Sequence, residues 1–128
     1  MLKKRLITLL ERSGSIRLAI LFGSVAQGEA GVESDLDLAL LMGGEMSVET
    51  RMDLIEQVAL LSGRPVDLID LSTVGEPLLG QILQTGERLF GSDGEYGSLL
   101  SRHLLDQADF MPYRERILAE RRAAWIGS

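Results

Sequence analysis

The residues best suited to chemistry are three aspartates that stand among apolar neighbours. Asp35 and Asp37 flank Leu36 at the start of one alternating run, and Asp67 begins a second run. Residues two apart in a strand share a face, so the first two carboxylates should lie together with their α-carbons roughly 6–7 Å apart. Hard cations such as Mg²⁺ prefer carboxylate oxygens and keep positions open for phosphate and water. The pair predicts a site for a metal-bound nucleotide, although such acids are also common on the solvent face of a strand.

A third carboxylate would complete this site if the strand that begins near Asp67 lay beside the first strand. Three carboxylates could hold two cations, which activate an attacking oxygen and neutralise a leaving pyrophosphate in an in-line displacement. Asp67 could also accept the proton of the attacking group. Asp70 lies an odd number of residues away and should face the opposite side. We therefore assign catalysis and metal binding to Asp35, Asp37 and Asp67.

A glycine and a serine, Gly23 and Ser24, follow the apolar run 16–22. A glycine lets the backbone approach a ligand closely, and a hydroxyl with nearby amides can hold a phosphate. The two residues are therefore candidates for nucleotide binding. The same turn would serve equally well as a plain connection between two elements.

Periodicity predicts the elements that must position these residues. Helices are expected at residues 2–12, 47–61 and 75–85, strands at 16–22, 35–42 and 66–71, and a short edge strand at 88–90. We expect Ser47 to cap its helix, and Val48, Met52, Ile55 and Val58 to form the buried face of that helix. This order of elements predicts an α/β (α+β) fold, a small mixed sheet flanked by helices. The chain 1–128 should form a single domain whose C-terminal part is helical from about residue 96, with a break near Pro112.

Composition limits the possible partners. The chain has 128 residues, a formal net charge of −6 and no cysteine. An acidic chain lacks the clustered cations that grip long DNA or RNA, but it can accept a small polyanion that arrives with its own cation. Without cysteine, disulfides and thiolate zinc sites are impossible, and a reducing cytoplasm is the expected location. No stretch is long and apolar enough to predict a membrane span.

The motifs together resemble those of a known superfamily. Gly23 and Ser24, ten intervening residues, and then Asp35-Leu36-Asp37 resemble the signature of the polymerase beta-like nucleotidyltransferases, and Asp67 fits their third acid. The stretches 23–28 and 34–38 look especially like the minimal nucleotidyltransferases (MNT) of prokaryotes. The resemblance is strongest over about residues 16–71.

This resemblance implies an activity and a partner. It implies two Mg²⁺ ions, ATP as the donor, Ser24 on a phosphate, and Asp35 and Asp37 on the metals. Minimal members often act as antitoxins that add AMP to a tyrosine of a small helical HEPN-domain toxin, and this is the role we expect. A small-molecule nucleotidyltransferase, a catalytically silent partner-binding protein and a homodimer remain alternatives. His103 is expected at a surface or an interface, and sequence alone does not place Arg51 or Arg64 near a triphosphate.

Overall fold

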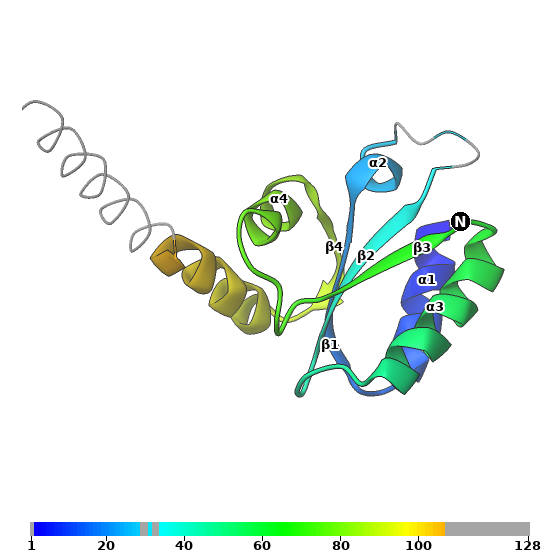
Figure 1. Ribbon diagram of the computed structural model, residues 1–128, viewed down its shortest axis with the longest axis horizontal. Helices are drawn as coiled ribbons and strands as arrows, with labels where there is room; N and C mark the ends of the chain where they lie inside the picture. The colour runs from blue at the N-terminus through cyan, green and yellow to red at the C-terminus, as the bar shows by residue number, and fades with distance from the viewer. Residues whose placement is uncertain (1, 29–30, 32–33, 107–128) are drawn as a thin grey trace, which may run out of the picture.

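The fold is a mixed sheet with helices on both faces (Figure 1). The computed structural model describes residues 2–28, 31 and 34–106. Four strands lie in the order β3-β2-β1-β4. The pairs β1·β2 and β1·β4 are antiparallel, while β2 and β3 are parallel. The predicted fold class is confirmed.

The elements follow the predicted order closely. They are α1 (Leu2–Arg12), β1 (Ile16–Phe22), α2 (Gly23–Ala26), β2 (Leu36–Met42), α3 (Val48–Ser62), β3 (Val66–Asp70), α4 (Leu78–Thr85) and β4 (Glu87–Gly91). A further helical segment spans residues 93–106. Helix α4 begins three residues later than expected because residues 76–77 form a turn before it. The expected break near Pro112 lies outside the described residues.

Two apolar clusters fill the two sides of the sheet. Even-numbered residues of β2, including the fully buried Leu36 and Leu38, join the cluster beneath α1 and α3. Ala39 belongs to the second cluster, which also holds Leu79 and Ile82 of α4. Successive strand residues point to opposite faces, so Asp35 and Asp37 share the face of α4. The acids therefore stand on the side of the sheet away from α1 and α3.

The buried face of α3 matches the predicted one only in part, since Val58 is buried and Ile55 packs against the core as expected, but Val48 and Met52 do not. Ser47 caps this helix as expected, accepting a hydrogen bond from the amide of Thr50. However, Leu54 and Val58 are the residues buried against the sheet, whereas Val48 and Met52 are 71% and 65% exposed. The helix carries apolar residues on both flanks, so periodicity alone did not identify the packed one.

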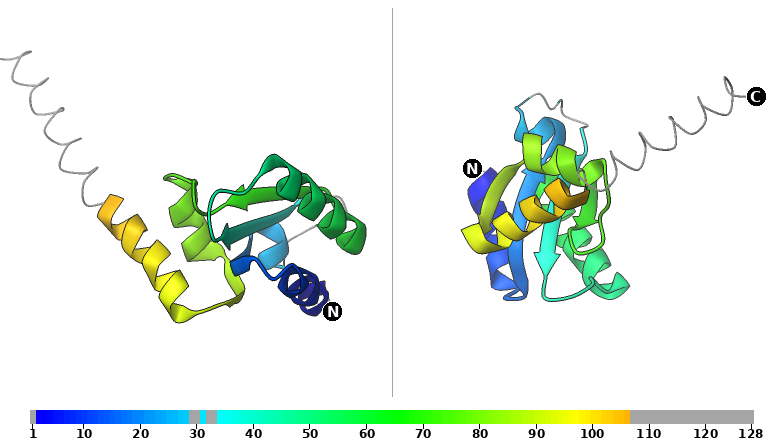
Figure 2. Two further views of the ribbon diagram at one scale, coloured as in Figure 1. Left: turned by 90° about the horizontal axis from the view of Figure 1, so that it is seen from below. Right: turned by 90° about the vertical axis from the view of Figure 1, so that its left-hand side faces the viewer.

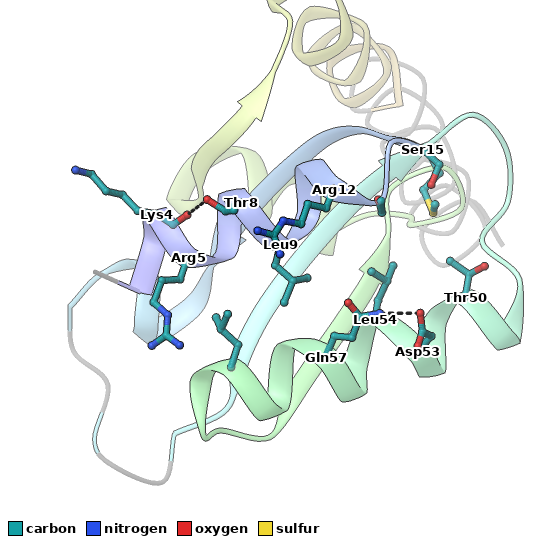
Figure 3. Close-up of a pocket in the computed structure, with 13 residues that line it drawn as sticks. Lys4, Arg5, Thr8, Leu9, Arg12, Ser15, Thr50, Asp53, Leu54 and Gln57 are labelled. Carbon is teal, nitrogen blue, oxygen red and sulfur yellow. Dashed lines mark hydrogen bonds between the residues drawn. The ribbon is translucent and has the colours of Figure 1, made fainter.

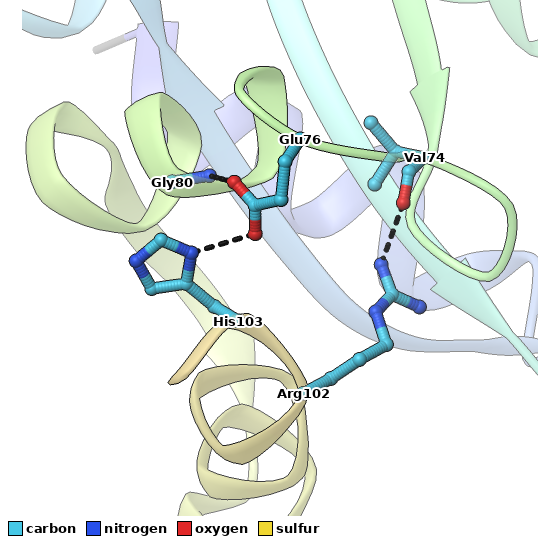
Figure 4. Close-up of polar contacts among 5 residues, drawn as sticks. All are labelled: Val74, Glu76, Gly80, Arg102 and His103. Carbon is cyan, nitrogen blue, oxygen red and sulfur yellow. Dashed lines mark hydrogen bonds and ion pairs between the residues drawn. The ribbon is translucent and has the colours of Figure 1, made fainter. Parts of the chain in front are cut away.

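Segment 93–106 is held against the α4 side by polar contacts (Figures 2 and 4). Arg102 donates hydrogen bonds to the carbonyls of Leu71 and Val74, at 3.1 and 2.9 Å. His103 Nδ1 lies 2.6 Å from Glu76 Oε1, and only 12% of the histidine side chain is exposed. His103 thus lies at an interface within the chain. Every helix in the described part of the chain is too short or too polar to cross a bilayer.

Candidate active site

The pairing of β2 with β3 brings two of the predicted aspartates side by side. Asp37 is the direct partner of Asp67 in this parallel register. Neighbouring strands lie about 4.8 Å apart, and paired side chains project from the same face. Asp35 precedes the first residue of β2 and shares that face. Three acids from two separate segments therefore gather where β2 and β3 begin.

The carboxylate of Asp37 is in an unfavourable electrostatic environment. Partial burial raises its pKa above the ordinary value, and the negative charges of Asp67 and Asp35 raise it further. Desolvation and like charges both disfavour an ionised carboxylate. A bound cation would relieve both effects, because it supplies the missing opposite charge. The site therefore has the electrostatic character of a cation-binding site.

Gly23 lies directly beside the side chain of Asp37. Its backbone is in the left-handed region, with φ of +72°. A Cβ at this position would overlap Asp37 Oδ2 and lie 3.1 Å from Asp37 Cγ. The register explains this contact, since Phe22 is the antiparallel partner of Asp37 and Gly23 follows directly. The absence of a side chain at Gly23 leaves room for the carboxylate.

Ser24 stands in the short helix α2, at the end of the sheet where β2 begins (Figure 1). It is half-buried. The structure thus brings Gly23 and Ser24 to the same end of the sheet as the three acids. The binding of phosphate by Ser24 remains a prediction.

The donor set suits a hard cation, although its ligands are not fully converged. Within the described residues, no three carboxylate or imidazole side chains already stand close enough to share one ion. Asp35 and Asp67 are exposed, whereas Asp37 is half-buried and lies next to Gly23. A metal would be bound by Asp37, with Asp35 and Asp67 turning toward it.

Asp70, at the end of β3, has a structural role on the opposite face, as the spacing predicted. It is 4% exposed and accepts hydrogen bonds from the amides of Met46 and Ser72 and from the Ser72 hydroxyl. Burial alone would raise its pKa, but these hydrogen bonds and the nearby charge of Arg51 together lower it. Asp70 thus anchors the loop before α3 and is separate from the three acids.

Two arginines that the sequence left unplaced bind backbone carbonyls. Arg51 donates to the carbonyl of Leu68. Arg64 donates from Nη1 to the carbonyls of Gly31 and Ser34, at 2.7 and 3.0 Å. These contacts join segments distant in sequence, and no local pattern could have revealed them. Arg64 reaches the segment that leads directly into Asp35.

A groove of about 680 Å³ lies between α1 and α3 (Figure 3). Lys4, Arg5 and Arg12 line the α1 side, and Asp53 and Gln57 of α3 lie opposite. The groove is on the other face of the sheet from the three predicted acids. It is therefore not the place where those acids would meet a nucleotide.

Comparison with known proteins identifies the family. The family described as "Polymerase beta, Nucleotidyltransferase" matches residues 4–95, which include the glycine and serine and all three acids. The chain belongs to this family. The resemblance inferred from the motifs is thereby confirmed.

Relatives in the family include protein adenylyltransferase MntA of Shewanella oneidensis strain MR-1. It is 32% identical over 77 residues, which cover 60% of this chain and 55% of the relative. The fold also matches a chain in the crystal structure of a toxin-antitoxin with AMP-PNP, with a TM-score of 0.77 and 26% identity over 93% of this chain and 98% of the other.

A further match is a structure of tri-AMPylated Shewanella oneidensis HEPN toxin in complex with MNT antitoxin. Its TM-score is 0.68 at 23% identity, over 91% of this chain and 96% of the other. At this identity the likeness shows a shared fold alone.

Proposed function

We propose that this chain is a metal-dependent nucleotidyltransferase that moves AMP from ATP to a side chain of a partner protein, a HEPN-type toxin that it silences as an antitoxin. The observation that carries the proposal is the pairing of Asp37 with Asp67 beside Gly23, with Asp35 on the same face. The adenylyltransferase named among its relatives supports AMP as the transferred group. The reaction would take place in the cytoplasm, where the sequence predicts the protein to be.

Each residue of the site has a role that follows from its position. Asp37, which lies next to Gly23, would bind Mg²⁺ together with Asp35 and Asp67. When bound, two Mg²⁺ ions would supply positive charge for the attacking and leaving oxygens. Gly23 would bring its backbone close to the triphosphate, and Ser24 would donate its hydroxyl to a phosphate oxygen.

The transfer itself is an in-line displacement at the α-phosphorus of ATP. The acceptor hydroxyl oxygen forms a bond to this phosphorus while the bond to the bridging oxygen breaks, and pyrophosphate leaves. Asp67 is exposed beside Asp37 and would take the proton of the attacking hydroxyl. The chain thus supplies a metal site and a base, while a partner protein supplies the acceptor.

The direct test is transfer of label from ATP. The purified protein is incubated with ATP labelled at the α-phosphate and Mg²⁺, with and without a HEPN-type protein encoded beside it. We expect label on the partner, and no label with Asp35→Ala. Asp53→Asn is the matched control, because Asp53 is an exposed aspartate of α3 on the other face and should leave transfer unchanged.

The alternatives give different results in the same assay. Label on a small hydroxylated acceptor, with none on protein, would replace the proposal with a small-molecule nucleotidyltransferase. No transfer to either acceptor, combined with tight partner binding that Asp35→Ala leaves intact, would show a silent binding protein.

A further inference from the structure

Asp35 lies between two residues whose backbones are held by a distant part of the chain. Before it, the carbonyl of Ser34 accepts a hydrogen bond from Arg64. After it, the amide of Leu36 donates to the carbonyl of Pro65 at 2.8 Å. The two holding residues are consecutive and come directly before β3. The same short stretch, residues 64–67, therefore fixes the backbone of Asp35 and supplies Asp67.

Gly31 and Ser34 are joined to each other by two hydrogen bonds, and Arg64 binds both of them. The amide of Ser34 donates to the carbonyl of Gly31 at 3.3 Å, and the amide of Gly31 donates to Ser34 Oγ at 3.0 Å. Arg64 Nη1 reaches both carbonyls. Donors that carry a charge make the stronger hydrogen bonds, and a guanidinium holds its donors in a fixed geometry.

Gly31, whose carbonyl Arg64 binds, is a glycine and so has wide intrinsic backbone freedom. None of the ion pairs among the described residues involves Arg64, so its charge is directed at the carbonyls and not at a carboxylate of the site. Its backbone is itself fixed, because Gly63 ends α3 in the left-handed conformation and Pro65 begins the approach to β3.

We infer that Arg64 is a positioning residue that holds Asp35 in register with Asp37 and Asp67. This inference rests on the proposed function and assigns to that site a residue outside its motif. Strand pairing fixes the backbones of Asp37 and Asp67, but Asp35 lies just before β2 begins. Arg64 restrains the backbone just before Asp35, at a point that strand pairing does not reach. Residues that orient metal ligands typically contribute about ten- to hundredfold in metal affinity or activity.

The test compares Arg64→Met, Arg64→Lys and the control Arg17→Met. Methionine keeps an apolar stem without a donor, and lysine keeps the positive charge without the planar guanidinium group. Arg17 is an exposed arginine of β1 whose closest carboxylate contact is 3.8 Å, to Glu95. Three quantities are measured: amide hydrogen exchange at Ser34 and Leu36, binding of Mn²⁺ by electron paramagnetic resonance, and kcat and KM for label transfer.

We expect Arg64→Met to speed exchange at both amides and to weaken Mn²⁺ binding by about tenfold or more. Its kcat should fall by a similar factor while KM for ATP changes little, and Arg64→Lys should restore part of the loss. The control should match the wild type in every measurement. A loss of general stability would instead speed exchange throughout the sheet, including the buried centre of β1.

A double-mutant cycle with Ser34→Ala tests whether Arg64 acts on Asp35 through its contacts with Gly31 and Ser34. Both substitutions weaken the same contacts of Gly31 and Ser34, so the loss of Mn²⁺ affinity in the double variant should be smaller than the sum of the two single losses. Wild-type exchange and Mn²⁺ affinity in Arg64→Met would overturn the positioning role while leaving the proposed function intact. A wild-type protein that neither binds Mn²⁺ nor transfers label would overturn the proposed function, and the inference with it.

Discussion

The contact between Gly23 and Asp37 allows a substitution whose effects on stability and on activity can be separated. Gly23→Ala places a methyl group where Asp37 Oδ2 now lies. The carboxylate is the end of a rotatable side chain, so it can turn away at little cost in stability. The backbone strain cannot be avoided, because φ is +72° and an L-residue in that region costs about 1–2 kcal/mol.

For a domain of this size, a loss of about 1–2 kcal/mol lowers Tm by roughly 4–8 °C. The effect on the rate of AMP transfer should be much larger than this modest effect on stability. A displacement of about 1 Å in a catalytic group can cost about a hundredfold in rate, and Asp37 must move by at least this much to clear the methyl group. We therefore expect a modest change in Tm together with at least about a hundredfold loss of transfer.

Gly14→Ala is the matched control. Gly14 has φ of +73°, and a Cβ there would meet nothing within 4 Å. It carries the same backbone strain in the turn between α1 and β1, away from the acids. Thermal unfolding should give similar Tm values for the two variants, whereas labelled ATP should show transfer only for Gly14→Ala. Equal transfer by both variants would refute the proposal that Gly23 makes room for a working carboxylate.

Three further predictions concern charge and polar contacts. Asp37→Asn should stabilise the metal-free protein at pH 7 by up to about 1 kcal/mol in urea unfolding, because the raised pKa of Asp37 favours its neutral form. That gain should vanish below about pH 4, where the wild-type carboxyl is protonated in both states; a gain that persists there would have another cause. Asp70→Ala should cost about 2–4 kcal/mol at pH 7, since it leaves buried amides without an acceptor. The lowered pKa of Asp70 means that its contribution is present above the ordinary aspartate pKa and is lost as pH falls through the lowered value, so urea midpoints of variant and wild type should converge in acid. Arg102→Met should speed hydrogen exchange in the last described helix, because the bonds to Leu71 and Val74 are lost, and unchanged exchange would show that apolar packing alone holds it.

Much of the site could be read from local sequence because strand geometry is local. Alternation in an extended chain fixes which residues share a face, and this placed Asp35 and Asp37 together and Asp70 opposite Asp67. The glycine-serine pair after an apolar run marked the end of β1. The family was evident from the same spacing, since it depends on residues within one short stretch.

Tertiary structure decided what depends on residues far apart. Asp67 is thirty positions from Asp37, and only the parallel pairing of β3 with β2, after the crossover through α3, brings the two together. The sequence also left the packed face of α3 undetermined. Met52 and Leu54 are both apolar, and only packing against the sheet decides that Leu54 is the one buried. Arg64 gave no local signal, because its acceptors are backbone carbonyls that every residue possesses. Periodicity determines which way a side chain points within its own element, but the long-range packing of the elements determines which side chains meet.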